Sequence, residues 1–329
     1  MLGNKESQLG QRIVAWGAPT WVRPEEWIPL PELEVGQERL VGLYRVNNAA
    51  NQCVAFTVSG AYTVDWGDGG APQNFNAGAK AEHTYDFAAV DPETETPEGW
   101  RQAIISITPQ PGATLTGINL TSVHSIGTGN YTSWWLDVAV VGAGLTSCRC
   151  GGIAGASLKP LSNMQRFTFT GTNSIANFGG MFWGCSSLQS VPLFDTSSGT
   201  SFRSMFDGCS SLQSVPLFDT SSGTRFDWMF WGCSSLQSVP LFDTSSGTNF
   251  YSMFWGCSVL YAGALSGTRY TISYGNCKLD RAAIVAVFNA LGTAVPPAQT
   301  ITVTGNPGVP YLTPEDIAIA TDKGWAVAT

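Results

Sequence analysis

The sequence CSSLQSVPLFDTSSGT occupies residues 185–200 and returns unchanged at 209–224 and 233–248, a period of 24 residues. A repeat of this length predicts that each copy forms one turn of a stack and packs against its neighbours. In the first copy, Leu188, Val191 and Leu193 have the spacing L-x-x-L-x-L. We expect these side chains to point inward around a short strand, with the polar residues between them facing out.

The remainder of each repeat carries an aromatic residue followed by Met-Phe, as in Phe178, Met181 and Phe182. This spacing predicts one turn of α or 3₁₀ helix with its apolar face on the strand layer. A cysteine recurs at the repeat period and is therefore expected to be a reduced, buried part of the core. An aspartate that opens each D-T-S-S-G segment is expected to accept backbone N–H groups in an Asx turn. These positions are Cys185, Cys209, Cys233 and Cys257, and Asp195, Asp219 and Asp243.

The segment FDTSSGTSFRSMFDGCSSLQSV, residues 194–215, resembles the BspA-like class of leucine-rich repeats, which share MF-x-G-C-S-S-L and D-T-S. The resemblance covers roughly residues 160–260. The chain departs from the family where Leu193 runs directly into Phe194, without the extra Ser-Asn often found there, so a tighter corner is expected. The resemblance implies adhesion or protein recognition and no catalysis.

The fold expected for the whole chain is mainly β, an immunoglobulin-like β-sandwich followed by a leucine-rich-repeat solenoid with a helical C-terminal cap. The solenoid is placed at residues 113–276, with the 24-residue repeats clearest at 164–259. An α/β cap follows at 277–329, because an amphipathic segment runs from Asp280 to Gly292 and Thr313 precedes Pro314 as a helix N-cap.

Residues 40–112 contain alternating apolar runs separated by Gly, Asn, Asp and Pro, which predicts a small β-sandwich. The stretch YTVDWGDG at 62–69, followed by His83-Thr84-Tyr85, resembles the signature of the PKD-type immunoglobulin-like domain. That resemblance implies a structural turn and no catalytic residue. Asp65 and Asp68 are weak candidates for a metal site, since a cation needs more clustered carboxylates than these.

Residues 1–39 form an expected N-terminal arm that contains Trp16, Trp21 and Trp27 beside several prolines. Aromatic residues that a short segment cannot bury by itself indicate docking on something larger. Two interpretations stay open. The arm docks on other virion proteins, or it folds back and covers the chain's own sandwich.

The positions at which the repeats differ are the candidates for partner contact. A row of tryptophans follows Met-Phe, with Asp207 in place of one of them, and further aromatic residues vary nearby. These side chains could stack on sugar rings or anchor a protein, or they could shield the Met-Phe layer. The face that carries Gln189 and Pro192 predicts a flat neutral surface rather than a deep pocket. The candidate contact residues are Trp183, Trp228, Trp231, Tyr251 and Trp255.

Composition excludes several classes of function for this chain of 329 residues. Its net charge of −8 and the lack of a Lys/Arg cluster disfavour nucleic acid. The two histidines, His83 and His124, lie in different expected domains, which disfavours a two-histidine metal centre or a Ser-His-Asp triad. We expect no catalytic residues and no cofactor. We also expect no signal peptide and no membrane insertion, because no apolar stretch has the required length.

These features predict a non-enzymatic virion structural protein of a tailed bacteriophage, a fibre or a head or tail decoration, that assembles in the host cytoplasm. The C-terminal G-N-P-G turn with Lys323-Gly324-Trp325 also resembles phage structural proteins with such repeats. The expected partners are other virion proteins, a host-surface glycan or protein, and further copies of the chain. A bacterial surface adhesin is the alternative, and a polysaccharide-degrading tail enzyme ranks last.

Overall fold

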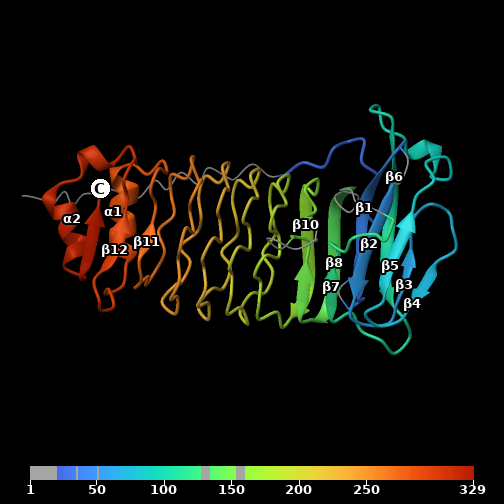
Figure 1. Cartoon of the computed structure of the whole chain (residues 1–329), viewed down its shortest axis with the longest axis horizontal. Coiled ribbons are helices and arrows are strands. Elements are labelled where there is room, and N and C mark those ends of the chain that lie inside the picture. Colours follow the sequence, from blue (N-terminus) through green and yellow to red (C-terminus); the bar gives the residue numbers. More distant parts are fainter. Residues whose placement is uncertain (1–20, 35, 50–51, 127–133, 153–159) are drawn as a thin grey trace, which may run out of the picture.

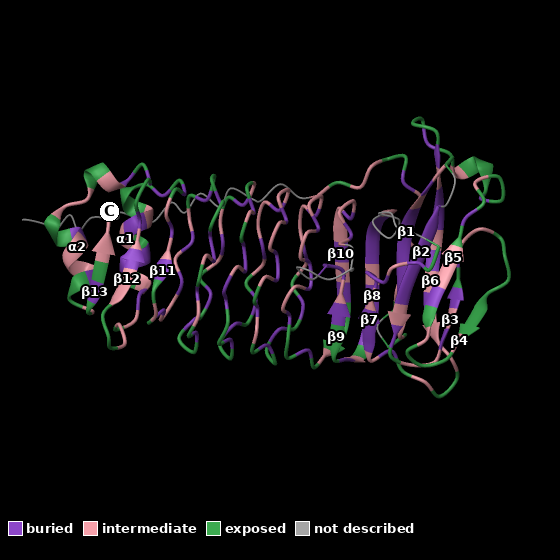
Figure 2. Cartoon of the chain, in the orientation of Figure 1, coloured by how far each residue is buried: buried purple, intermediate pink, exposed green. Residues whose placement is uncertain are grey.

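The molecule is elongated, with β-sheets at one end, a row of stacked turns in the middle and two helices at the other end of the described chain (Figure 1). This computed structural model describes residues 21–34, 36–49, 52–126, 134–152 and 160–329. Buried residues occur in every layer from the first strands to the C-terminal helices (Figure 2), and most of them belong to one hydrophobic cluster. The core is therefore continuous along the long axis.

The larger sheet of the described residues has six strands in the order β10-β8-β1-β6-β3-β4. Neighbouring strands are antiparallel except β8 and β10, which are parallel. The strands are β1 (Arg39–Asn47), β3 (Tyr62–Asp65), β4 (Gln73–Phe75), β6 (Trp100–Pro109), β8 (Trp135–Leu145) and β10 (Arg166–Asn173).

The second sheet has, within the described chain, the strand order β5-β2-β7-β9. It consists of β2 (Cys53–Val58), β5 (Lys80–Thr84), β7 (Gly117–Asn119) and β9 (Ser147–Arg149). The two sheets share one apolar core, in which Phe56 of β2 meets Trp135 of β8 at a ring-centroid distance of 6.2 Å. Four of the alternating runs expected between residues 40 and 108 correspond to β1, β2, β3 and β6, whereas the run at 83–87 is strand only as far as Thr84, the end of β5. The short β4 had no such run.

Both sheets continue across the boundary expected after residue 112. In the larger sheet β10 follows β8, and Arg166 at the start of β10 bridges in parallel to Ser190 of the first exact repeat. In the second sheet the N–H of Cys150, which follows β9, donates to the carbonyl of Met181 at 2.9 Å. The first sheets thus cover the end of the stack. The domain boundary itself stays a prediction.

The repeats stack in register, one copy on the next. Thr224 N–H donates to the Thr200 carbonyl and Thr248 N–H to the Thr224 carbonyl, both at 2.9 Å. Inside the stack the rings of Phe182, Phe206 and Phe230 lie face to face with centroid distances of 5.4 and 5.6 Å. The described repeats contain isolated parallel bridges instead of longer strands. Backbone ladders and aromatic files together hold each turn to its neighbours.

The Met-Phe segments form tight turns and are not assigned as helix. Met205 N–H donates to the Phe202 carbonyl and Cys209 N–H to the Phe206 carbonyl, at 3.1 and 3.0 Å. These bonds join residues three positions apart, as in 3₁₀ structure. The turn side of each repeat therefore has the i, i+3 hydrogen bonds of the expected 3₁₀ structure, but the segment is too short to be assigned as a helix.

The prediction that Leu193 and its equivalents point inward is wrong. The side chains of Leu193, Leu217 and Leu241 are 63%, 59% and 58% exposed, whereas the phenylalanine that follows each of them is buried. The N–H of Phe218 donates to the Pro216 carbonyl at 2.9 Å, which closes a three-residue turn centred on Leu217. This turn breaks the two-residue alternation of a strand, so the inward position moves on to the phenylalanine.

Two other expectations for the repeat are confirmed. Asp219 Oδ1 accepts hydrogen bonds from the backbone N–H and the hydroxyl of Ser221, at 3.1 and 2.6 Å, which is an Asx turn. The repeated cysteines are buried free thiols. Cys233 Sγ donates to the Phe206 carbonyl at 3.1 Å. Burial raises the pKa of the Cys233 thiol well above its ordinary value.

The C-terminal end of the stack is covered by α1 (Arg281–Ala290) and α2 (Pro314–Thr321). Asp280 caps α1, and Thr313 caps α2 in a capping box with Asp316, as the sequence indicated. A three-stranded parallel sheet of described residues lies beside them, and 3₁₀ turn η3 (Val309–Tyr311) precedes α2. Its strands are β11 (Ile272–Ser273), β12 (Gln299–Thr302) and β13 (Trp325–Ala328).

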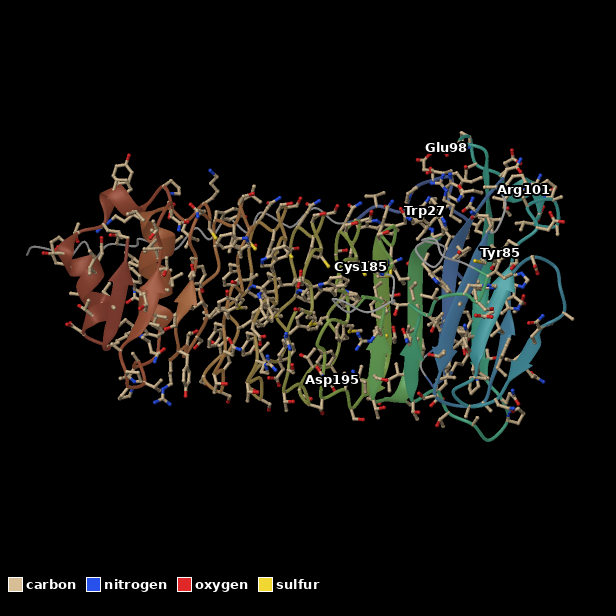
Figure 3. All side chains as sticks on the ribbon, in the orientation of Figure 1. Trp27, Tyr85, Glu98, Arg101, Cys185 and Asp195 are labelled. Atoms are coloured by element: carbon tan, nitrogen blue, oxygen red, sulfur yellow. The ribbon has the colours of Figure 1, made fainter. Side chains whose placement is uncertain are left out.

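The described part of the N-terminal arm lies against the chain's own larger sheet. Trp27 lies at the sheet end of the molecule (Figure 3) and is only 6% exposed. It packs with Leu43, Trp100 and Leu136. Trp21 packs beside it, and the Arg23 guanidinium pairs with the buried carboxylate of Asp137. The folded-back interpretation therefore holds for these residues. Trp16 lies outside the described residues, and a virion-docking role for the arm stays a prediction.

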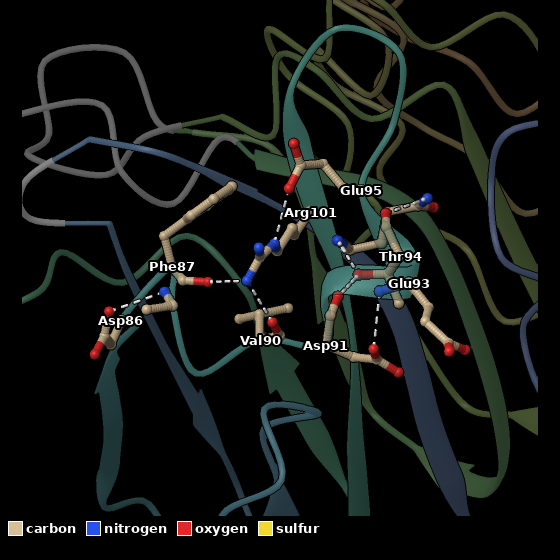
Figure 4. A network of polar contacts seen from close by, with 10 residues as sticks. Asp86, Phe87, Val90, Asp91, Glu93, Thr94, Glu95 and Arg101 are labelled. Atoms are coloured by element: carbon tan, nitrogen blue, oxygen red, sulfur yellow. Dashed lines mark hydrogen bonds and ion pairs between the residues drawn. The ribbon is translucent and has the colours of Figure 1, made fainter.

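A polar network fixes the loop between β5 and β6, which includes the 3₁₀ turn η1 (Pro92–Thr94). Arg101 Nη1 donates to the carbonyls of Phe87 and Val90, both at 2.8 Å, and Arg101 Nε donates to Glu95 at 3.1 Å (Figure 4). Asp91 caps η1 by accepting the Glu93 N–H at 2.9 Å. Each of these groups serves the loop itself, so the network is structural.

Candidate functional site

A groove of about 720 Å³ opens on the turn side of the stack. All of its lining residues except Arg149 and Gly152 occupy four positions of the repeat at which the copies differ. The chemistry of the lining is mixed, with indoles, guanidinium groups and one carboxylate. The lining residues are Arg149, Gly152, Asn177, Gly179, Gly180, Trp183, Ser201, Arg203, Ser204, Asp207, Arg225, Trp228 and Trp231.

The space in the groove depends on Asp207. This residue lies between Trp183 and Trp231 in one file, because Gly184 N–H donates to the Asp207 carbonyl and Gly208 N–H to the Trp231 carbonyl, both at 2.7 Å. Neighbouring turns are only about 5.5 Å apart, as their stacked phenylalanines measure. A third indole at this position would fill the gap between the two tryptophans. The aspartate leaves it open.

Asp207 is half-buried, although an aspartate in place of a tryptophan indicates a solvent-exposed position. Burial raises the pKa of its carboxyl group, although hydrogen bonds from the Ser204 and Trp183 side chains act in the opposite direction. The carboxylate therefore faces a groove that is partly desolvated. It can accept hydrogen bonds from a bound hydroxyl.

Two of the groove's arginines are held in place by one buried carboxylate. Asp227 is 1% exposed, and it accepts hydrogen bonds from Arg225 Nε at 3.1 Å and Arg225 Nη2 at 2.9 Å. Arg203 Nε lies 3.1 Å from the same Asp227 Oδ2. Shared pairing fixes both guanidinium groups in one orientation, which preorganises them toward a ligand.

Trp228 has a left-handed backbone conformation, with φ of +57°. The equivalent positions of the other turns also have positive φ, but they carry small residues, Gly180, Ser204 and Ser252. A bulky residue in this region costs about 1 kcal/mol or more. Ser204 and Ser252 also carry a Cβ and share this strain, so what distinguishes Trp228 is the large side chain that it places at the groove.

The structure brings together three of the five predicted contact residues. Trp183, Trp228 and Trp231 line the groove. Tyr251 meets the edge of Trp228 at a centroid distance of 5.6 Å, and Trp255 is 62% exposed on the turn after Trp231. The row is thus part groove wall and part exposed surface. The flat neutral surface expected on the face of Gln189 and Pro192 concerns another side of the repeat, since neither residue lines this groove.

Sequence reasoning missed the three arginines. Arg203 and Arg225 occupy varied positions, so the differences between the repeats were a usable signal for them. Arg149 precedes the exact copies and had no such signal. It ends β9, and its half-buried side chain reaches the groove from the adjacent turn.

Asp65 and Asp68 serve the turn after β3. Asp65 Oδ1 accepts the Gly67 N–H at 3.0 Å, and Asp68 Oδ1 accepts the Gly70 N–H at 3.1 Å. Asp68 Oδ2 also lies 2.8 Å from Nε2 of His83, whose ring stacks on Trp66. Among the described residues no group of three or more His, Cys, Asp or Glu side chains has the arrangement of a metal site.

The described chain is mainly β, with several sheets, stacked repeat turns and two helices near the C-terminus, which defines a repeat protein. A family model described as "Mycoplasma protein of unknown function, DUF285" matches residues 158–264, about a third of the chain. The match is consistent with a BspA-like repeat protein. No curated protein matches the chain. In the part of the chain that is described, no helix has the length and apolarity to cross a membrane.

Proposed function

We propose that this chain is a non-enzymatic recognition protein whose ligand occupies the groove lined by Trp183, Trp228 and Trp231. One observation carries the proposal. The turns of the stack are identical where they build the core and differ where they line the groove. Packing alone does not explain why the differences are confined to these positions, because the same core accommodates every variant side chain. Selection for contact with a ligand would explain it.

The finer architecture belongs to the same proposal. Residues 40–112 form a PKD-type immunoglobulin-like sandwich, 113–276 a leucine-rich-repeat solenoid, and 277–329 its cap. The stacked phenylalanine files, the bonds between residues 24 apart and the capped helices support the solenoid and its cap. A solenoid gives the groove a rigid wall, since each turn is held by two neighbours.

The setting that we propose is the virion of a tailed bacteriophage, where the chain is a fibre or a head or tail decoration and contacts other virion proteins through residues 1–39. A bacterial cell-surface adhesin is the second candidate. Gold-labelled antibody on purified phage particles and on host cells separates the two. Label on cells in the absence of phage would refute the virion setting.

Catalysis on a glycan has little support from the groove. A glycosidase needs two carboxyl groups that flank the scissile bond. Asp227 is buried and paired with two arginines, which leaves Asp207 as the carboxylate that lines the groove. Shortened oligosaccharides after incubation of the protein with host envelope glycans would overturn the non-enzymatic proposal.

The recognition function is tested by binding of the purified chain to envelope fractions of candidate hosts. The double variant Trp183→Ala/Trp231→Ala removes both indoles that flank Asp207, and we expect it to lose binding while it keeps its circular dichroism spectrum. Tyr311→Ala is the matched control, because Tyr311 is 72% exposed near the opposite end of the stack. Equal binding by wild type and the double variant would contradict the proposal.

A further inference from the structure

The groove is a cationic feature of an acidic protein. The chain has a net charge of −8, yet the guanidinium groups of Arg149, Arg203 and Arg225 line the groove against the single lining carboxylate of Asp207. Asp227 lies behind the surface and partly neutralises two of these arginines. The remaining positive charge favours an anionic ligand in the groove.

Arg149 stands apart from the other arginines. Each of the other arginines in the described residues donates to a carboxylate, a carbonyl, an amide or a hydroxyl, or pairs with a carboxylate. The Arg149 side chain is half-buried and, within the described structure, has no polar partner. Burial lowers the pKa of its guanidinium group, since water is partly withdrawn from the charge. A cation in this situation is stabilised when a ligand supplies an anion.

The route from Arg149 to the groove is kept open by glycine. A Cβ on Gly180 would lie 3.9 Å from Nη1 of Arg149, so a longer side chain there would stand against the guanidinium group. The equivalent positions in the next two turns carry Ser204 and Trp228. Gly180 therefore leaves room beside the guanidinium, and Arg149 is part of the groove lining.

The other groups define which anion fits. Indole rings stack on the apolar faces of sugar rings. The Asp207 carboxylate repels a second negative charge and accepts hydrogen bonds from hydroxyl groups. Closely spaced charges, as on a nucleic acid strand or an acidic peptide, would place one of them against Asp207. A ligand with one carboxylate among many hydroxyls meets both requirements.

We propose that the groove binds an acidic oligosaccharide, with the carboxylate of a sugar acid on Arg149 and its neighbouring ring against the tryptophans. This inference rests on the proposed recognition function of the same groove. The guanidinium forms two parallel hydrogen bonds to the carboxylate, and Arg203 and Asp207 bind ring hydroxyls.

The test uses the full chain and matched probes that carry one carboxylate each, namely 3′-sialyllactose against lactose, and a disaccharide of glucuronic acid and a neutral sugar against its methyl ester, measured by calorimetry and saturation-transfer NMR. We expect at least one acid to bind about tenfold or more tightly than its neutral partner, because a charge-assisted bond is lost in the partner. Arg149→Gln removes that preference. Arg269→Gln, an exposed arginine far along the chain, leaves it unchanged.

The outcomes separate this inference from the proposed function. If neither acid is preferred, or if Arg149→Gln keeps the preference, the acidic-sugar inference is overturned. Binding of the envelope that still requires Trp183 and Trp231 would then leave the recognition function standing, with a neutral or protein ligand. Loss of both the acid preference and the tryptophan dependence would overturn the two together. Tighter binding of an acidic peptide or oligonucleotide than of either acid also refutes the inference.

Discussion

The guanidinium carbon of Arg203 lies 4.8 Å from the centroid of the Trp228 ring, and the two residues come from successive turns of the stack. This cation–π contact is worth about 0.5–1 kcal/mol at a partly exposed site. Arg203 and Trp228 both occupy positions at which the repeats differ. The contact orders the groove and adds little to the core beneath it.

Replacement of Trp228 by glycine tests whether this residue serves the groove or the fold. We expect Trp228→Gly to change the free energy of unfolding by less than about 1 kcal/mol, since relief of the φ strain offsets the lost ring contacts. Phe230→Ala, in the buried file beside it, should cost about 3–5 kcal/mol. Urea unfolding measures both. A loss above about 2 kcal/mol for Trp228→Gly would make the tryptophan part of the core.

Because the Leu217 side chain points outward, we predict that its replacement has little effect on stability, although it belongs to the repeated motif. Leu217→Ser should change the free energy of unfolding by no more than about 0.5 kcal/mol, because the side chain is 59% exposed. Leu212→Ala in the same repeat should cost about 2–5 kcal/mol, because Leu212 is fully buried. Chemical denaturation of the two variants checks this difference. Similar losses of stability in the two variants would show that the Leu217 side chain points inward.

The cysteine file predicts thiols that are inert in the folded protein. Burial raises the pKa of Cys209, Cys233 and Cys257, and the thiolate is the form that reacts. Iodoacetamide at pH 8 should label none of these three until denaturant is added, as mass spectrometry of tryptic peptides would measure. Rapid labelling of the native protein, or a disulfide between neighbouring turns, would show that these cysteines are not buried as free thiols.

We predict that the carboxylate of Glu82 on β5 contributes to the stability of the fold in a pH-dependent way. Burial acts to raise its pKa, but hydrogen bonds from Lys80 and from the hydroxyl and N–H of Ser125 prevail and hold it at about 2. A folded pKa below the unfolded value means that the contribution is complete above about pH 4.5 and is lost as the pH falls toward 2. Glu82→Gln should therefore be less stable than wild type at pH 7, with a difference that shrinks below pH 4.5.

The matched control is Glu93→Gln, at an exposed position on η1. Thermal unfolding of wild type and both variants between pH 2.5 and pH 7 measures the effect. A Glu82→Gln deficit that stays constant over this range would show that the carboxylate charge contributes nothing.

The helix caps and the Asx turns could be predicted because they depend on neighbours in the sequence. Asp280 and Thr313 bond to N–H groups three residues ahead, and Asp219 to one two residues ahead. Periodicity could not predict which residue points inward at the corner Val191-Pro192-Leu193-Phe194, since a three-residue turn moves the inward position by one residue. Only the observed path of the chain shows which of Leu193 and Phe194 enters the core.

The sequence by itself determined that the repeats stack, because identical 24-residue units can bury their apolar residues only against one another. It also determined which positions vary. The tertiary structure decided that these positions meet in one groove, that Asp207 opens it and that Arg149 reaches it from the turn before the exact copies. The reason is physical. Repetition places equivalent residues about 5.5 Å apart, whereas the convergence of different positions depends on how each turn bends around its core.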